Sequence, residues 1–379
     1  MIAQAKHIEA KILDIKYGRV LEGLKIGIPD IDEYIRFKQG NFNLLIGHAN
    51  VGKTTIITYL FTVWAIKHNL KFLVWSSENS SSGLVRKIIE FKMGLPIQDA
   101  SDSQINAAVK WTDLHFKIIE VEELFTYKQL LKQANDIKDA WDYDALLIDP
   151  YNSLAKDTQI MRGVGSHEYD YQVASEFRLF AKKRNVAVYL NAHGVTDALR
   201  RVHPRDHEYE ELPQPLGLAG VEGGGKWGNR SDDVISIHRY TGSAMDWMYS
   251  HLHVLKVKET ETGGRCTPHN EPIKLRMSRN NVGFEFMGRD ILHSKKTDIT
   301  EILKFSIMIQ SIALLLLIAT IFVFISNQVK ADVYIQPIIG FMFGALYSKE
   351  ILEDSLTQYT LQWCGGFISI TIVWINKKR

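Results

Sequence analysis

Short apolar runs alternate with longer, charged segments of helical periodicity over residues 23–298. The runs predict strands at 42–46, 71–75, 116–120, 145–148, 186–190 and 234–238, then a hairpin-like pair at 251–258 and 273–278. Helices are predicted between them, at 54–69, 84–93, 127–141 and 171–183. Uninterrupted apolar strands that alternate with helices are typical of a mostly parallel sheet with helices on both faces. The expected fold class is therefore α/β.

Two segments rich in glycine and proline interrupt this pattern, at 194–230 and at 259–272. The first is much longer than the loops that are usual in a compact domain. We therefore expect it to be either functional or disordered.

A change of composition near residue 300 divides the chain. No charged residue occurs in 305–329, and as a helix this stretch is long enough to span the roughly 30 Å of bilayer hydrocarbon. Basic residues before it and at the C-terminus favour a hairpin with both ends cytoplasmic. We expect membrane spans at about 305–326 and 356–376, with the short apolar stretch between them interfacial or re-entrant. A buried core helix is the alternative for the first span.

The composition narrows the class of protein. There are 45 lysines and arginines against 43 aspartates and glutamates, with 46% hydrophobic residues, which excludes a disordered or strongly basic chain. Cys266 and Cys364 cannot form a disulfide scaffold or a four-cysteine zinc site, which favours a reducing compartment. The N-terminal residues lack the apolar core of a secretory signal. We expect the bulk of the chain to be cytoplasmic, anchored to a membrane through the C-terminal segment.

Residues 47–54 read GHANVGKT and match the phosphate-loop pattern G-x-x-x-x-G-K-[S/T], between a predicted strand and a predicted helix. The glycines let the backbone curl so that successive N–H groups face a phosphate at a helix N-terminus. Lys53 would bridge the β- and γ-phosphates of ATP or another nucleoside triphosphate, and the Thr54 hydroxyl would hold Mg²⁺. The residues expected to bind the nucleotide are Gly47, Asn50, Val51, Gly52, Lys53, Thr54 and Thr55.

Three polar side chains follow neighbouring predicted strands. Asp149 ends the run 145–148 and is expected on the metal side, where its carboxylate reaches the Mg²⁺ shell. Glu78 follows the run 71–75, positioned to orient or deprotonate the attacking water. His193 ends a further strand, where it could hydrogen-bond the γ-phosphate. The alternatives are a helix cap for Glu78, a turn residue for Asp149 and a structural role for His193.

The order of these motifs resembles the RecA-like ring helicases of the DnaB-like superfamily, especially the phage and mitochondrial primase-helicase branch. The resemblance covers about 23–286 and is carried by KIGIPDIDEYIRFKQGNFNLLIGHANVGKTT, VWSSENSSSGLVRKI, ALLIDPYNSL and FRLFAKKRNVAVYLNAHGV. It implies a RecA-like P-loop NTPase domain over 23–298. It also implies that Glu78 is the catalytic glutamate, Asp149 the metal-side aspartate, and His193 the residue that is Gln or His in the family.

The chain departs from the family pattern at both ends. It has no Cys-rich zinc module and no primase-length N-terminal region, so no primase activity is inferred. Residues 1–22 resemble a remnant of the linker helix that packs on an adjacent subunit in such rings. The membrane region expected at 299–379 lies outside the family pattern.

The segment GVEGGGKWGNRSDDVISIHR resembles the family's passage from a DNA-binding loop to a Gln-x-x-Asp stretch, with Asn229 in place of the glutamine. In HVLKVKETETGG, Lys256 and Lys258 fall at the family's basic pair, whose arginine reaches the ATP of the neighbouring subunit. Lys258 stands where that arginine is expected, and a lysine supplies a point charge without the planar guanidinium. Other candidates for this role are Arg265, Arg276 and Arg279.

A ring helicase holds single-stranded DNA through backbone contacts from basic, flexible loops. The residues expected to bind DNA are Arg200, Arg201, Lys226, Asn229 and Arg230. The acidic stretch HEYEELPQP within the same segment leaves a solvated excursion as the alternative.

The resemblance implies a hexameric replicative DNA helicase that hydrolyses ATP, translocates 5′ to 3′ on single-stranded DNA and opens the duplex. Primase or other replication proteins would be its partners besides the ring of identical subunits. Two alternatives stay open. One is a RecA- or RadA-like recombination or repair ATPase, which unwinding of a forked duplex would distinguish from a helicase. The other is a membrane-tethered P-loop ATPase that does not act on DNA, whose ATP turnover should be indifferent to single-stranded DNA.

Overall fold

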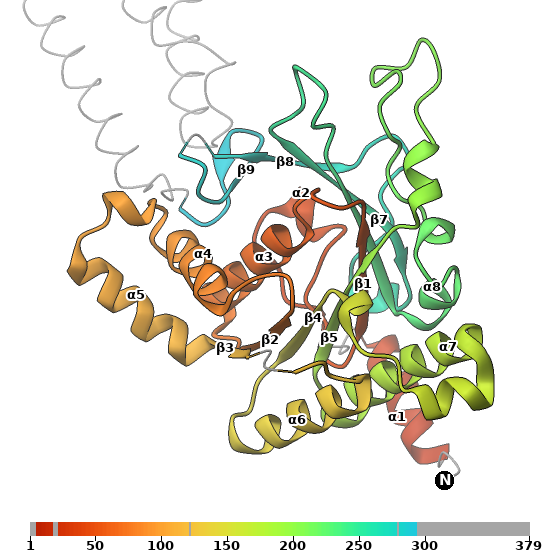
Figure 1. Cartoon of the computed structure of the whole chain (residues 1–379). Coiled ribbons are helices and arrows are strands. Elements are labelled where there is room, and N and C mark those ends of the chain that lie inside the picture. The colour runs from red at the N-terminus through yellow and green to blue at the C-terminus, as the bar shows by residue number, and fades with distance from the viewer. Residues whose placement is uncertain (1–4, 18–21, 121–122, 279, 294–379) are drawn as a thin grey trace, which may run out of the picture. The chain divides into compact units, whose positions relative to one another are not determined.

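The computed structural model of the chain describes residues 5–17, 22–120, 123–278 and 280–293 (Figure 1). Residues 1–293 form one of the two compact units of the chain. In the described part no helix is both long and apolar enough to span a bilayer. The membrane spans expected at about 305–326 and 356–376 lie outside the described residues, so they stay predictions.

A ten-stranded sheet forms the centre of the described part (Figure 1). Its strands are β1 (Phe42–Gly47), β2 (Phe72–Ser76), β3 (Phe116–Ile119), β4 (Ala145–Asp149), β5 (Ala187–His193), β6 (Asp233–His238), β7 (Tyr249–Val257), β8 (Ile273–Met277), β9 (Phe284–Phe286) and β10 (Arg289–Asp290). Their order is β10-β9-β8-β7-β6-β1-β5-β4-β2-β3. The strands from β6 to β3 in that order are parallel, whereas β7, β8, β9 and β10 pair antiparallel. The expected mostly parallel sheet and the hairpin-like pair are confirmed.

The helices are α1 (Ala5–Lys16), α2 (Pro29–Asp32), α3 (Lys53–His68), α4 (Ser81–Met93), α5 (Asp102–His115), α6 (Tyr127–Ala140), α7 (Thr158–Arg184) and α8 (Lys226–Arg230). The four expected helices correspond to α3, α4, α6 and α7. The apolar pattern does not predict α5, because its buried face carries Ala108, Thr112 and His115 instead of large apolar side chains. Helix α7 begins well before the expected start and is kinked at Gly165, where φ is +75°.

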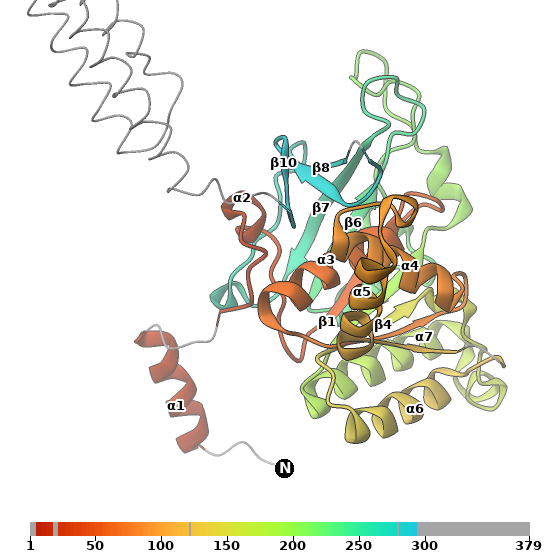
Figure 2. The same ribbon diagram turned by 90° about the vertical axis from the view of Figure 1, so that its left-hand side faces the viewer.

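Alternate residues of the central strands point into two different apolar layers. Leu44 and Ile46 of β1 pack in the layer formed with α6 and α7, whereas Leu45 packs in the layer formed with α3 and α4. In β4, Leu146 and Leu147 divide in the same way. Figures 1 and 2 show α3, α4 and α5 on one face of the parallel strands and α6 and α7 on the other. Burial on both faces explains why these strands are continuously apolar in sequence.

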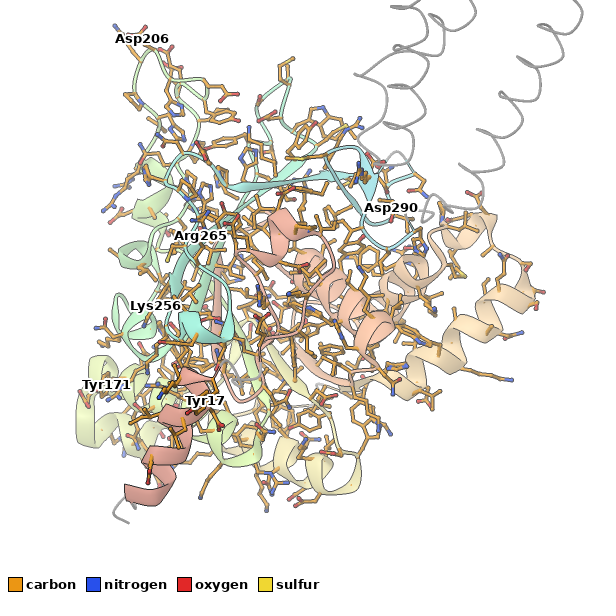
Figure 3. All side chains as sticks on the ribbon, turned by 180° about the vertical axis from the view of Figure 1, so that it is seen from behind. Tyr17, Tyr171, Asp206, Lys256, Arg265 and Asp290 are labelled. Carbon is orange, nitrogen blue, oxygen red and sulfur yellow. The ribbon has the colours of Figure 1, made fainter. Side chains whose placement is uncertain are left out.

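The glycine- and proline-rich segment 194–230 is a folded excursion from the sheet. Backbone bridges connect its two sides. Near its tip Tyr209 stacks on Tyr240, which follows β6, with ring centroids 3.6 Å apart. Asp206 marks the tip itself (Figure 3). The excursion is therefore attached to the sheet by specific contacts.

A cluster of buried histidines lies where this excursion meets the sheet. His238, at the end of β6, packs edge-on against His48 and Tyr240, with ring centroids 5.8 and 4.5 Å apart. Its ring nitrogens have no hydrogen-bond partner among the described residues. Burial lowers the pKa of His238 to about 3, and it lowers the pKa of His251 and of His253 in β7 to about 4. All three are therefore neutral near pH 7.

The histidine cluster should cost the folded chain stability as the pH falls from about 6.5 toward 5. Each histidine has a folded pKa below its unfolded value of about 6.5, so the unfolded chain binds more protons in this range and acid favours unfolding. His238→Phe should make the thermal midpoint less sensitive to pH between 7.5 and 5, as followed by circular dichroism. His68→Gln, whose ring contacts the Lys25 carbonyl oxygen outside the cluster, should keep the parent's pH dependence. Identical slopes for the parent and His238→Phe would contradict this prediction.

Candidate active site

The register of the parallel strands brings the ends of β1, β5, β4 and β2 together at one edge of the sheet. Gly47 lies opposite His193 across β1 and β5, and Ser76 lies opposite Asp149 across β2 and β4. Strands β4 and β5 pair directly. The phosphate loop, Asp149 and the segment that carries Glu78 therefore all start from the carboxyl edge, where open α/β sheets bind their ligands.

The phosphate loop turns tightly because two of its positions lack a side chain. At Gly47 a Cβ atom would lie 2.4 Å from the carbonyl oxygen of Ile237. At Gly52 φ is +86°, and Asn50 also has a positive φ of 61°. Gly52 caps α3, which begins at Lys53. The loop therefore leads into a helix N-terminus, whose first N–H groups lack partners within the helix.

Lys53 is buried at the centre of the site, with 5% of its surface exposed. Its ammonium group donates to two carbonyl oxygens of the phosphate loop, at 2.9 and 3.1 Å, and lies 3.3 Å from His193 Nδ1. Burial lowers the pKa of Lys53 to about 8, although the charges of Asp149 and Glu78 act in the opposite direction. Lys53 therefore lies close to His193, Asp149 and Glu78, the residues that the sequence predicts for the active site.

Asp149 is held by three donors at the end of β4. Its Oδ2 accepts hydrogen bonds from the hydroxyls of Thr54 and Ser76 at 2.8 and 3.2 Å, and its Oδ1 accepts one from the Asn191 amide. Only 2% of the residue is exposed, and burial raises the pKa of this carboxyl group above its usual range. The three hydrogen bonds act against that rise because they stabilise the charged form.

Glu78 lies at the rim of the same site. Its Oε1 is 3.3 Å from His193 Nε2, and 52% of its side chain is exposed. His193 thus stands between Glu78 and Lys53, with one ring nitrogen toward each. The two acids and the histidine expected from the sequence therefore lie together around Lys53. Their catalytic roles stay predictions.

The remaining residues of the phosphate loop differ in their surroundings. Val51 is buried in the apolar layer that contains α3, whereas Asn50 is exposed. The Thr55 hydroxyl, in the first turn of α3, accepts a hydrogen bond from Lys87 Nζ at 3.4 Å. Of the two threonines, Thr54 is the one that contacts Asp149.

The pair Thr54 and Asp149 suits a hard divalent cation. Mg²⁺ is commonly bound by one or two carboxylates together with phosphate oxygens of the substrate. Here a hydroxyl and a carboxylate meet at 2.8 Å beside the first turn of α3. This donor set fits the Mg²⁺ expected with ATP.

The sequence pattern does not single out Ser76 and Asn191, which hold Asp149. Ser76 is the last residue of β2, and Asn191 is fully buried in β5. A polar residue near the carboxyl end of an otherwise apolar strand is the signal that could identify each of them.

Lys258 lies at the opposite edge of the sheet from the phosphate loop. It follows β7, whose last residue Val257 pairs with Asp233 at the start of β6. Its backbone N–H donates to the Asp233 carboxylate at 3.3 Å, and its ammonium group is 3.6 Å from Asp232. Lys258 therefore takes no part in the site around Lys53 of its own chain.

The other basic candidates contact neighbouring groups. Lys256 donates to two backbone carbonyl oxygens at the end of α8, at 2.7 and 2.8 Å. Arg265 pairs with Glu33 at 2.6 Å, and Arg276 pairs with a glutamate of β9 at 3.5 Å. Lys256 and Arg265 are both labelled in Figure 3, and Arg279 lies outside the described residues.

The residues expected to bind DNA come from two parts of the segment 194–230. Arg200 ends the 3₁₀ turn Thr196–Arg200 and Arg201 follows it, whereas Lys226, Asn229 and Arg230 belong to helix α8. Arg200 is exposed and pairs with Asp197 at 3.2 Å. The Arg230 guanidinium lies over the Tyr171 ring of α7, 4.0 Å from its centroid. Their role in DNA binding stays a prediction.

The chain matches no protein-family model, and no curated protein matches it in sequence. Solved structures do match it. The ATPase domain of G40P aligns with 76% of this chain and 100% of its own length, at 13% identity and a TM-score of 0.59. The chain has a RecA-like fold. A DnaB-like replicative helicase, described with its interactions with primase, aligns over 75% of this RecA-like chain and 67% of its own length, at 13% identity and a TM-score of 0.57.

Gly47→Ala should destabilise the RecA-like domain, because the added Cβ would meet a backbone oxygen that cannot move aside. Overpacking of this kind typically costs about 1–3 kcal/mol, which would lower the midpoint of urea unfolding. Gly217→Ala is the matched control, since a Cβ there meets nothing within 4 Å and φ is −87°. Equal midpoints for the two variants would contradict the close approach at Gly47.

Proposed function

We propose that this chain is an ATP-dependent DNA helicase of the hexameric replicative type, which translocates on single-stranded DNA and unwinds the duplex. The meeting of Glu78, Asp149 and Lys53 at one edge of the sheet is the observation that supports the proposal most. The RecA-like fold, shared with the ATPase domain of G40P and with a DnaB-like replicative helicase, supports it too. By resemblance to the phage and mitochondrial branch, the direction of translocation is 5′ to 3′.

ATP would bind with its phosphates at the loop 47–54. The start of α3 offers backbone N–H groups and the positive end of the helix dipole, and Lys53 adds a full charge. A phosphate oxygen would replace the loop carbonyl oxygens that now accept from Lys53. Thr54 and Asp149 would hold Mg²⁺, which neutralises phosphate charge when it is bound.

The surroundings of the two acids suit them to different tasks. Asp149 is buried and both of its oxygens accept hydrogen bonds, so its carboxylate is fixed in place beside the expected metal position. Glu78 is half exposed, so it can orient a water molecule for attack on the γ-phosphorus and accept its proton. His193, between Glu78 and Lys53, would hydrogen-bond the γ-phosphate.

A ring of identical subunits would complete each ATP site with a residue of the neighbour. Lys258 lies at the edge of the sheet opposite Lys53, so it can reach ATP only on another copy of the chain. Helix α1 exposes Ile12 and Ile15, which suits a linker helix that packs on an adjacent subunit. Both features support an oligomer, and the hexamer follows from the resemblance.

The expected partners follow from the same proposal. Single-stranded DNA would contact the excursion and α8 through Arg200, Arg201, Lys226, Asn229 and Arg230. Primase is a candidate partner, because a replicative helicase of the same fold interacts with primase. The membrane spans expected after residue 299 would anchor the ring to a membrane.

Single-stranded DNA should raise the ATP turnover of the full chain several-fold, because DNA in the ring would order the segments that complete each site. Phosphate release with and without a saturating dT oligonucleotide measures the effect. An ATP turnover that DNA does not change would favour a membrane-tethered ATPase. Stimulation without unwinding of a forked duplex would favour a recombination or repair ATPase on the same core.

Glu78→Gln should lower kcat by roughly 10²–10⁴-fold while nucleotide binding is retained, because an amide cannot accept the proton of the attacking water. Lys53→Ala should abolish turnover and also weaken nucleotide binding, since it removes the charge partner of the phosphates. Binding of a fluorescent ATP analogue separates the two effects. Glu208→Gln, near the tip of the excursion, is the control. Full turnover by Glu78→Gln would remove Glu78 from the reaction.

A further inference from the structure

A ring of hydrogen bonds links the candidate active site to the glycine-rich turn at 222–225. The backbone N–H of His193 donates to Asn152 Oδ1 at 3.4 Å, and the Asn152 amide donates to the Glu222 carboxylate. The backbone N–H of Glu222 donates to the His193 carbonyl oxygen at 3.1 Å. The three residues thus close a ring of hydrogen bonds at the end of β5.

The turn beyond Glu222 is packed against anchored side chains. At Gly223 φ is +87°, and a Cβ atom there would lie 2.6 Å from Trp227 Nε1 and 3.0 Å from Asp170 Oδ2. The Trp227 ring packs edge-on against Tyr151, with centroids 4.4 Å apart. The Tyr151 hydroxyl donates to Asp170 of α7 at 2.6 Å. The turn therefore packs against Trp227 and Asp170, and both of these contact Tyr151, which follows β4.

Residues 149–152 connect this support to the candidate active site. Asp149 is the metal-side candidate, Tyr151 supports the turn, and Asn152 bonds Glu222. Because they follow one another within four residues of backbone, a displacement at one end of the segment moves the other. The phosphate site and the turn are thus joined through one short segment.

His193 takes part both in the candidate active site and in the hydrogen bonds with Asn152 and Glu222. Its ring lies between Lys53 and Glu78, whereas its backbone N–H and C=O bond Asn152 and Glu222. When a γ-phosphate binds or leaves, a shift of the His193 imidazole would also move the His193 backbone N–H and C=O. These are the groups that hydrogen-bond Asn152 and Glu222. Asn152 and Glu222 are exposed, so their hydrogen bond can exchange with water at modest cost.

We propose that Asn152 is a positioning residue that couples the phosphate site to the 222–225 turn and so sets how strongly single-stranded DNA stimulates ATP hydrolysis. The inference rests on the proposed function. An amide fits this position because it accepts from His193 and donates to Glu222 at the same time. Aspartate could accept but not donate, and alanine could do neither.

The test compares ATP turnover of the full chain with and without a saturating dT oligonucleotide. Asn152→Ala, Asn152→Asp and Glu222→Ala should each lower the stimulation by DNA to about 1.5-fold or less. Glu222→Gln should keep it within about twofold, because the amide oxygen still accepts from Asn152. Asn152→Ala combined with Glu222→Ala should be no worse than either single variant, as expected when two residues act through one contact.

A second measurement follows the turn itself. Amide hydrogen exchange over 220–225 should change when a non-hydrolysable ATP analogue is added to the parent chain, and it should stay the same in Asn152→Ala. Glu208→Ala is the matched control, because it removes an acidic residue from the same excursion away from the hydrogen-bonded ring. It should keep the parent's stimulation and exchange.

The outcomes separate this inference from the proposed function. Equal stimulation of the parent and of Asn152→Ala would overturn the coupling and leave the helicase proposal intact. A loss in Glu222→Gln as large as in Glu222→Ala would also overturn it, because the charge of Glu222 and not its hydrogen bond would then matter. If DNA does not change the ATP turnover of the parent chain, the proposed function is overturned, and the coupling with it.

Discussion

The side-by-side parallel pairing of β1, β5, β4 and β2 is the constraint from which the candidate site follows. The ladders set Gly47 opposite His193 and Ser76 opposite Asp149, so polar groups from distant parts of the chain meet at one edge. A shift of one strand by one residue would turn each of its side chains to the other face of the sheet. Apolar layers cover both faces. They resist such a shift because it would exchange side chains of different size between two closely packed layers and draw the polar residues at the strand ends into them.

The site keeps charges of opposite sign out of water. Lys53 and Asp149 are both buried, and burial disfavours the charged form of each. Loop carbonyl oxygens compensate the lysine, and the hydroxyls of Thr54 and Ser76 with the Asn191 amide compensate the aspartate. Fixed partners of this kind hold the charged groups in place before a phosphate arrives, which is the arrangement that stabilises charge during a reaction at low cost.

The two edges of the parallel sheet carry different groups. The carboxyl edge holds the phosphate loop, the acids and His193, whereas the amino edge holds Lys258 beside Asp232. One copy of the chain therefore cannot bring both sets to the same nucleotide. Helix α8 is tied to β7 through Lys256. The contacts of Asn152 connect the turn 222–225, which precedes α8, to the carboxyl edge of the sheet. The turn and α8, which carries residues expected to bind DNA, are therefore attached to the carboxyl edge and to β7.

Much of the candidate site could be predicted because its signals are local. Glycine positions, a strand before and a helix after are properties of neighbouring residues, and they identify the loop at 47–54. Apolar runs likewise place Asp149 at the end of one strand and Glu78 just after another, and in the structure Asp149 ends β4 and Glu78 follows two residues after β2. Helix α5 could not be predicted in this way because its buried face is weakly apolar, and β9 and β10 could not because they have only three and two residues.

The contacts that Ser76, Asn191 and Asn152 make, and the edge at which Lys258 lies, could not be predicted in this way. Each depends on which strand lies beside which, and the order of strands is set by packing between segments far apart in the chain. The pattern of apolar and polar residues thus specified the elements and the chemistry at their ends. The pairing of the strands, fixed by burial on both faces of the sheet, specified which of those ends meet.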